Sequence, residues 1–299
     1  MAKPGRGPIC LFIAAILFSG MAVGVKLASE RIPAGQIVMY RFLFGLAVLH
    51  VLAAMGFSRI SHNKFRLQLM RGIAGGIAIV FYFLSIEHTT LLKSTLLGNS
   101  YPVFAALFGM ILLGERIKLQ TVAVFLVSII GVWLVVTSRT EGAASQLTNL
   151  ANGDLFGIAS GAVAGLAIVY IRQLRRTENS FSIFWYLCAV GVVLGAASCL
   201  FQPYVLPNLR EWLLIGWIGL SSTAAQLLIT YGFRYTPAAE GALIANSTVL
   251  YSGFAGWIFF GDRMTGWGLL GAALMFAGVV YLSTAPSATP RAEAVHQAR

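Results

Sequence analysis

Apolar runs of about 20 residues, separated by short polar gaps, fill most of the chain. A helix needs about 20 apolar residues to cross the roughly 30 Å hydrocarbon core of a bilayer. The runs that meet this length predict ten transmembrane helices, at residues 9–27, 34–56, 67–87, 91–112, 117–137, 153–173, 181–201, 211–232, 239–260 and 265–284. The gaps leave no room for an extramembrane domain. We therefore expect an all-α membrane protein.

Composition supports this interpretation. Of the 299 residues, 58% are hydrophobic and 10% are charged, whereas a soluble domain carries about 25% charged residues because its surface faces water. The formal net charge of +11 raises the question of nucleic acid, but the basic residues lie in the gaps between apolar runs and are not interleaved with aromatic residues. The chain is therefore expected to contact a lipid bilayer and no nucleic acid.

Lys and Arg residues are unevenly distributed between the two sides of the predicted spans. Fourteen lie on the side of residue 1 and six on the other side, with Arg41 left inside a span. The richer side includes the stretches 59–71 and 172–176. Cytoplasmic loops carry an excess of Lys and Arg. We therefore expect a multi-pass protein of the inner (plasma) membrane with both termini in the cytoplasm.

The second half of the chain repeats the first at an offset of 147 residues. Residues 98–117 (GNSYPVFAALFGMILLGERI) align with residues 245–264 (ANSTVLYSGFAGWIFFGDRM), and eleven identical pairs are found without a gap, among them Asn99/Asn246 and Ser100/Ser247. Each repeat holds five predicted helices. Since five is odd, the second repeat must enter the membrane from the opposite side. Inverted repeats of this kind are typical of alternating-access transporters.

These two stretches, together with the Arg41-Phe42 pair of the second span, resemble the paired EamA domains of the drug/metabolite transporter superfamily. The resemblance extends over roughly residues 9–284. It implies two inverted five-helix repeats, at 1–140 and 150–285, followed by a polar cytoplasmic tail at 286–299. It also implies a central cavity, often used to export amino acids or related metabolites. Pro102 departs from the repeat, because Val249 stands at the equivalent position.

Arg41 is the first candidate for a substrate contact. It lies about 6 Å from the middle of its predicted helix, and an ionisable residue at that depth indicates a functional site by default. A structural role, with the guanidinium tied to backbone carbonyls or to Glu87, is an equally weighted alternative.

Further candidates lie near the same depth. Asn99 and Asn246 occupy equivalent positions of the two repeats, and their amides can donate and accept hydrogen bonds to a polar substrate; an interhelical hydrogen bond is the alternative. Aromatic candidates for the cavity wall are Tyr82, Tyr101, Tyr231 and Tyr251. Glu87 and Glu240 are the candidates for proton coupling, because few carboxylates lie near the spans. Lys93, equivalent to Glu240, is expected to extend its side chain to the membrane interface.

Glycines at 153, 157, 161 and 165 predict a bare helix face for close packing. The cysteines Cys10, Cys188 and Cys199 lie in apolar runs and form no CxxC pair, so we interpret them as small apolar residues.

The function predicted from these patterns is secondary active transport, most simply export, of a small polar metabolite such as an amino acid. An uptake carrier or exchanger of the same fold is the alternative. A channel fits less well, because its pore-lining helix would be polar along its whole length, whereas the polar residues here are concentrated near the centre. A membrane enzyme fits less well, because the sequence has no HExxH, GxSxG or P-loop motif and its four histidines are scattered. We expect no catalytic residue, cofactor or metal. The expected partners are a small-molecule substrate and lipid, and a homodimer is left open.

Overall fold

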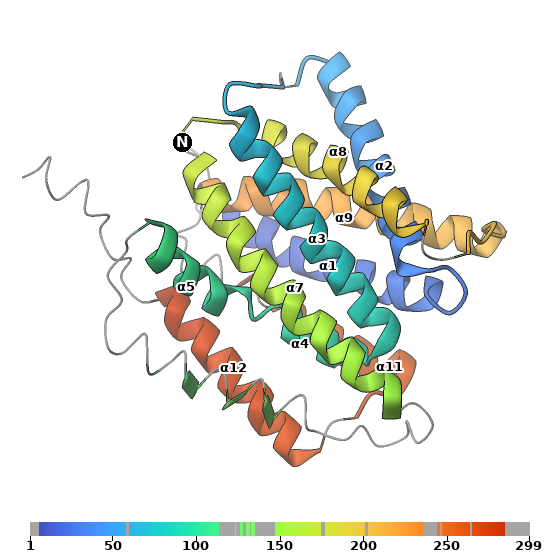
Figure 1. Cartoon of the computed structure of the whole chain (residues 1–299), viewed down its shortest axis with the longest axis vertical. Coiled ribbons are helices and arrows are strands. Elements are labelled where there is room, and N and C mark those ends of the chain that lie inside the picture. The colour runs from blue at the N-terminus through green and yellow to red at the C-terminus, as the bar shows by residue number, and fades with distance from the viewer. Residues whose placement is uncertain are drawn as a thin grey trace, which may run out of the picture.

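The computed structural model describes residues 6–57, 60–113, 123, 126–127, 130–131, 133–134, 147–174, 177–200, 203–235, 244–245, 247–263 and 265–284, and all regular secondary structure in these residues is helical (Figure 1). The helices are α1 (Arg6–Ala28), α2 (Ala34–Ala54), α3 (Phe65–His88), α4 (Leu91–Gly98), α5 (Tyr101–Leu113), α7 (Leu147–Leu174), α8 (Ser180–Ser198), α9 (Leu209–Tyr235), α11 (Thr248–Phe260) and α12 (Gly266–Thr284).

Six of these helices are long and apolar enough to cross a bilayer, namely α1, α2, α3, α7, α8 and α9. They correspond to the first, second, third, sixth, seventh and eighth predicted spans. Thr248–Phe260 and Gly266–Gly278 are shorter apolar stretches. Most of the fifth predicted span, 117–137, lies outside the described residues. The count of ten therefore stays a prediction.

The fourth predicted span, 91–112, is wrong as a single helix, because the structure divides it into α4 and α5 at Asn99 and Ser100. Pro102 accounts for the break. Its ring nitrogen has no hydrogen to donate to the carbonyl of residue 98, so a continuous helix would lose a bond there. Asn99 ends α4 by donating from its side-chain amide to the carbonyl of Thr95, at 2.8 Å.

Helices of the first half pack on helices of the second half in reciprocal pairs. In the repeat, α7 is the counterpart of α1, α8 of α2, α9 of α3 and α11 of α5. The packing of α1 on α9 is matched by that of α7 on α3, and the packing of α1 on α11 by that of α7 on α5. The packing of α2 on α9 is matched by that of α8 on α3, and α2 packs on its own counterpart, α8. This is the arrangement expected of two repeats related by an approximate twofold axis.

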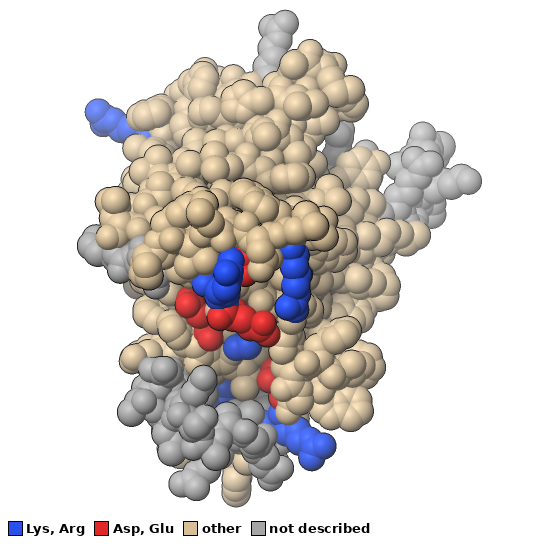
Figure 2. Space-filling model, turned by 90° about the vertical axis from the view of Figure 1, so that its right-hand side faces the viewer, with Lys and Arg blue, Asp and Glu red and all other residues tan. Residues whose placement is uncertain are grey.

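The outer surface is apolar, and one end of the bundle carries a patch of charged side chains. Large exposed side chains include Leu213 (69%), Phe254 (62%) and Trp257 (56%), as expected of helices that face lipid. Figure 2 views the end where the α1–α2 connection and the start of α9 lie, and shows Lys, Arg, Asp and Glu in one patch. We call this the charged end. The protein is thus a multi-pass membrane protein with one polar end face built by both halves.

Candidate substrate site

Arg41 lies inside the helix bundle on α2, and its side chain is almost completely enclosed. Its residue exposure is 5%. The guanidinium carbon lies 4.8 Å from the ring centroid of Phe42 and 5.6 Å from that of Phe83. Its Nε and Nη1 atoms have no hydrogen-bond partner among the described residues. Aromatic faces attract a cation but do not satisfy its N–H donors, so the guanidinium retains unused donors in the protein interior.

Glu87 is not the partner of Arg41, although the structural alternative named it beside backbone carbonyls. Its Oε2 accepts a hydrogen bond from the backbone N–H of Ala34, at 3.2 Å, at the charged end. Lys26 of α1 lies within electrostatic range of Glu87 and donates to the carbonyls of Ile86 and Thr89, at 2.7 and 2.6 Å. Glu87 therefore contacts the start of α2 at the charged end of the bundle.

Tyr82 connects Arg41 to the break between α4 and α5. The phenol of Tyr82 shares a hydrogen bond of 3.2 Å with Oγ1 of Thr95, and Arg41 lies within its electrostatic range. A Cβ atom at Gly98 would lie 3.0 Å from the Tyr82 ring, so the aromatic side chain rests directly on the break. Since Asn99 also donates to the carbonyl of Thr95, two of the sequence candidates, Tyr82 and Asn99, meet at this residue.

Of the remaining tyrosines, Tyr101 adjoins the break and the other two lie elsewhere. Tyr101 is the first residue of α5 and is half-buried. Tyr251 of α11 packs edge-on against Phe12 of α1, with ring centroids 5.7 Å apart. Tyr231, near the end of α9, is 42% exposed. Asn246 and Glu240 lie outside the described residues.

The bare face predicted for residues 153–165 is confirmed, and it packs along α4, the break and α5. A Cβ atom at Gly157 would meet Leu97, one at Gly161 would lie 2.7 Å from the carbonyl oxygen of Leu97, and one at Gly165 would lie 2.7 Å from the backbone nitrogen of Ala105. The backbone of α7 therefore packs closely against α4, the break and α5, as small residues allow at helix interfaces in membranes.

Arg71 is a buried residue that the sequence analysis misplaced. The prediction assigned it to a positively charged cytoplasmic loop, but it lies on α3 and is 6% exposed. Its Nε and Nη1 atoms have no hydrogen-bond partner among the described residues. A signal for this was present, because the apolar run of the third span already begins at residue 67.

A buried ion pair joins α4 to α7, and one of its members was not considered. Nζ of Lys93 lies 3.4 Å from Oδ2 of Asp154, and the two side chains are 3% and 5% exposed. Thr89 donates its hydroxyl to the same carboxylate, at 3.2 Å. The prediction that Lys93 extends to the membrane interface is therefore wrong. Its carboxylate partner lies 61 residues away in the sequence, so the pairing follows from the packing of the two halves.

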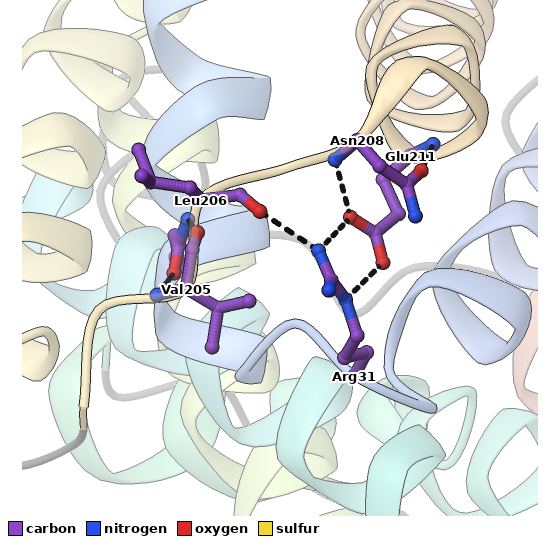
Figure 3. Close-up of polar contacts among 6 residues, drawn as sticks. Arg31, Val205, Leu206, Asn208 and Glu211 are labelled. Carbon is purple, nitrogen blue, oxygen red and sulfur yellow. Dashed lines mark hydrogen bonds and ion pairs between the residues drawn. The ribbon is translucent and has the colours of Figure 1, made fainter.

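At the charged end, Arg31 joins the first half to the start of α9 (Figure 3). Its Nε and Nη2 donate to the two carboxylate oxygens of Glu211, at 2.6 and 2.8 Å, and Nη2 also donates to the carbonyl of Leu206, at 2.8 Å. Hydrogen bonding to Glu211 raises the pKa of Arg31. The carboxylate of Glu211 accepts from the backbone N–H of Asn208, at 2.7 Å, and the side-chain oxygen of Asn208 accepts from the backbone N–H of Glu211, at 2.9 Å. This pair of hydrogen bonds is a capping box for α9.

Two other polar contacts join the halves at this end. The side chain of Gln36 donates to the carbonyl of Val205, at 2.6 Å, and accepts from its N–H, at 3.1 Å. Oδ2 of Asp262 accepts from the N–H of Leu92 at the start of α4, at 3.3 Å, and burial raises the pKa of this carboxyl group. Polar side chains therefore connect the first half to the α8–α9 and α11–α12 segments.

Comparison with known proteins gives consistent results over nearly the whole chain. The model of the EamA-like transporter family matches residues 5–137 and 151–284. The pseudopaline exporter CntI of Pseudomonas aeruginosa (strain PAO1) is 28% identical, over 93% of this chain and 95% of that protein. Human solute carrier family 35 member G1 is 25% identical, over 93% of this chain and 78% of that protein. A crystal structure superposes with a TM-score of 0.65 at 20% identity, covering 94% of this chain and 97% of that one, which indicates a shared fold alone.

Proposed function

This chain belongs to the EamA-like transporter family, and we propose that it exports a small polar metabolite by alternating access between its two halves. The family and the characterised relatives are transporters, not enzymes. Its substrate is a small molecule that binds near the middle of the membrane. Uptake or exchange of such a metabolite remains the alternative direction.

The observation that carries this proposal is the position of Tyr82, which lies against the α4–α5 break and within electrostatic range of Arg41. Transporters bind their substrates near the midplane at discontinuous helices, because the unwound backbone offers polar groups that a continuous helix uses internally. Here the break is enclosed by α7 of the other half, and Arg41 has unused donors among the described residues. A substrate at this point would contact both halves, as alternating access requires.

The export direction is supported by the name of one relative. CntI is described as a pseudopaline exporter. The sequence of this chain predicts repeats at 1–140 and 150–285 with opposite orientations and cytoplasmic termini, and we retain these boundaries and this topology in the proposal. In that orientation the charged end faces away from the cytoplasm. The membrane is the plasma membrane, and the tail at 286–299 is cytoplasmic.

Metabolite analysis of cells with and without the protein tests the transport proposal. Cells that express the chain should accumulate at least one small polar metabolite in the medium, and Arg41→Ala should abolish the difference. Purified protein in liposomes should then show saturable flux of that metabolite with counterflow, which a channel does not show. Identical intracellular and extracellular metabolites in the two strains would contradict the proposal, as would flux without saturation.

A further inference from the structure

Two buried guanidinium groups lie near Cys188 of α8. The thiol is within electrostatic range of both Arg41 on α2 and Arg71 on α3. A Cβ atom at Gly45, one turn after Arg41, would lie 2.9 Å from the Cys188 sulfur. Nη1 of Arg71 occupies the space that a side chain at Gly75 would need. The absent side chain at Gly75 thus makes room for the Arg71 guanidinium, and the one at Gly45 makes room for the thiol of Cys188.

Neither guanidinium has a carboxylate partner in the described part of the chain. The groups in electrostatic contact with Arg41 are Cys188 and Tyr82, and the one in contact with Arg71 is Cys188. The other buried basic side chain among the described residues, Lys93, has Asp154 as its partner. Within the described residues, a buried cation is therefore neutralised between α4 and α7, whereas two cations on α2 and α3 have no carboxylate partner.

We propose that Arg41 and Arg71 together bind a small organic dianion, with one acidic group on each guanidinium. An unpaired charge inside a membrane protein is costly and is kept where it serves a function. An arginine binds carboxylate or phosphate through two parallel hydrogen bonds. One monovalent anion would leave the second cation unpaired, whereas a dianion neutralises both. The inference rests on the proposed function in taking this dianion to be the transported solute.

The surroundings also restrict the part of the molecule between the acidic groups. Cys188 and Phe42 are buried, and the glycines at 45 and 75 present no side chains. These groups offer small or apolar surface near the two cations. The ligand is therefore a diacid with an apolar or weakly polar centre.

Thermal unfolding of the purified full-length protein in detergent tests this site without requiring transport. Succinate, glutarate and adipate are compared with butyrate, valerate and hexanoate, so that each diacid has a monoacid of equal carbon number at equal ionic strength. At least one diacid should raise Tm above the value given by its monoacid. Arg71→Gln should weaken the apparent affinity for that diacid about tenfold or more, because it removes a charge-assisted contact, and should bring it near that of the monoacid.

Two variants separate binding from folding. Arg66→Gln is the matched control, since Arg66 lies on the same helix and is exposed, and it should preserve the preference for the diacid. Gly75→Ala keeps both arginines but takes the space of the Arg71 guanidinium, and should weaken diacid binding in the same way as Arg71→Gln. Without ligand, Arg71→Gln should keep or raise Tm, because it removes an unpaired buried charge.

Three results would overturn the inference. The first is equal stabilisation of the wild type by diacids and monoacids. The second is an unchanged diacid preference in both Arg71→Gln and Gly75→Ala. The third is a diacid effect that appears only with Glu240→Gln, since that would show that a carboxylate of the chain itself fills the site.

Flux measurements distinguish the failure of this inference from the failure of the proposed function. Diacid binding without counterflow in liposomes, and without a metabolite difference between cells, would contradict the proposed function and leave the binding site intact. Saturable counterflow of neutral or monovalent solutes only, with no diacid preference, would contradict the dianion site and leave transport intact.

Discussion

At the scale of single residues, Arg41 is the strongest candidate for a substrate contact, because it is charged, lies deep in the bundle and carries a planar set of donors. Its guanidinium is buried over two phenylalanine rings with donors unused in the described part of the chain. Arg41→Lys keeps the positive charge but loses the planar set of donors. We expect transport to weaken strongly while the protein still inserts and folds. Equal flux for wild type and Arg41→Ala, at equal membrane abundance, would leave Arg41 with a structural role only.

Substitutions in the buried pair of Lys93 and Asp154 should affect the stability of the protein, whereas those of Arg41 should affect transport. Removing one partner leaves the other charge buried and unpaired, which costs about 3–5 kcal/mol. Lys93→Met should therefore lower the thermal stability of the purified protein. The double variant Lys93→Met with Asp154→Leu should recover much of the loss, because neither charge then remains. If the double variant is as unstable as the sum of the two single variants, the pair is not coupled as the 3.4 Å contact indicates.

These residues show what the sequence could and could not predict. The depth of Arg41 follows from counting along an apolar run, and its burial agrees with that count. Arg71 was misplaced because a charge near the start of a span also fits a loop. Asp154 could not be found as the partner of Lys93, because only the packing of α4 on α7 brings the two together. Asn246 and Glu240 lie outside the described residues, so their roles stay predictions.

At the scale of elements, the glycine face of α7 is the feature that sequence spacing predicted most directly. A Cβ atom at Gly161 would approach the carbonyl oxygen of Leu97 to 2.7 Å, and backbone cannot move away as a flexible side chain can. We expect Gly161→Ala to destabilise the protein by about 1–3 kcal/mol, as overpacking does. The measurement is thermal unfolding in detergent.

Gly216 of α9 is the matched control for this prediction. No atom lies within 4 Å of a Cβ atom at this position. Gly216→Ala should therefore keep or slightly raise stability, by up to about 1 kcal/mol, through better helix propensity. Equal effects at the two positions would mean that the close approach of α7 to α4 does not limit the packing.

The break between α4 and α5 illustrates the limit of hydropathy for predicting elements. Residues 91–112 are predominantly apolar and long enough to span a membrane, so their composition predicts a single helix. Pro102 removes one backbone hydrogen bond from a continuous helix, but this loss alone does not decide between a kink and a break. Asn99 favours the break, because its amide caps α4 at the carbonyl of Thr95.

At the scale of the whole molecule, the reciprocal packing of the two halves is the property that the internal repeat predicted. Eleven identical pairs at one offset define equivalent helices, and those helices pack on one another in matched pairs across the halves. The repeat did not predict which side chains join the halves at the charged end. Arg31 and Glu211 are 180 residues apart, and their contact depends on how the α1–α2 connection meets the start of α9.

If the two halves separate at the charged end during transport, a covalent link between Arg31 and Glu211 should stop it. The test uses Arg31→Cys with Glu211→Cys, in a background in which Cys10, Cys188 and Cys199 are replaced. Joining the two thiols with a short bifunctional reagent that a reductant cleaves should abolish flux in liposomes, and reduction should restore it.

Asn208→Cys with Glu211→Cys is the matched control, because it shares one thiol but links two residues of the same capping box. That link should leave flux nearly unchanged. Full flux through the Arg31–Glu211 link would show that the charged end stays closed throughout the cycle, and the movement would then have to occur elsewhere.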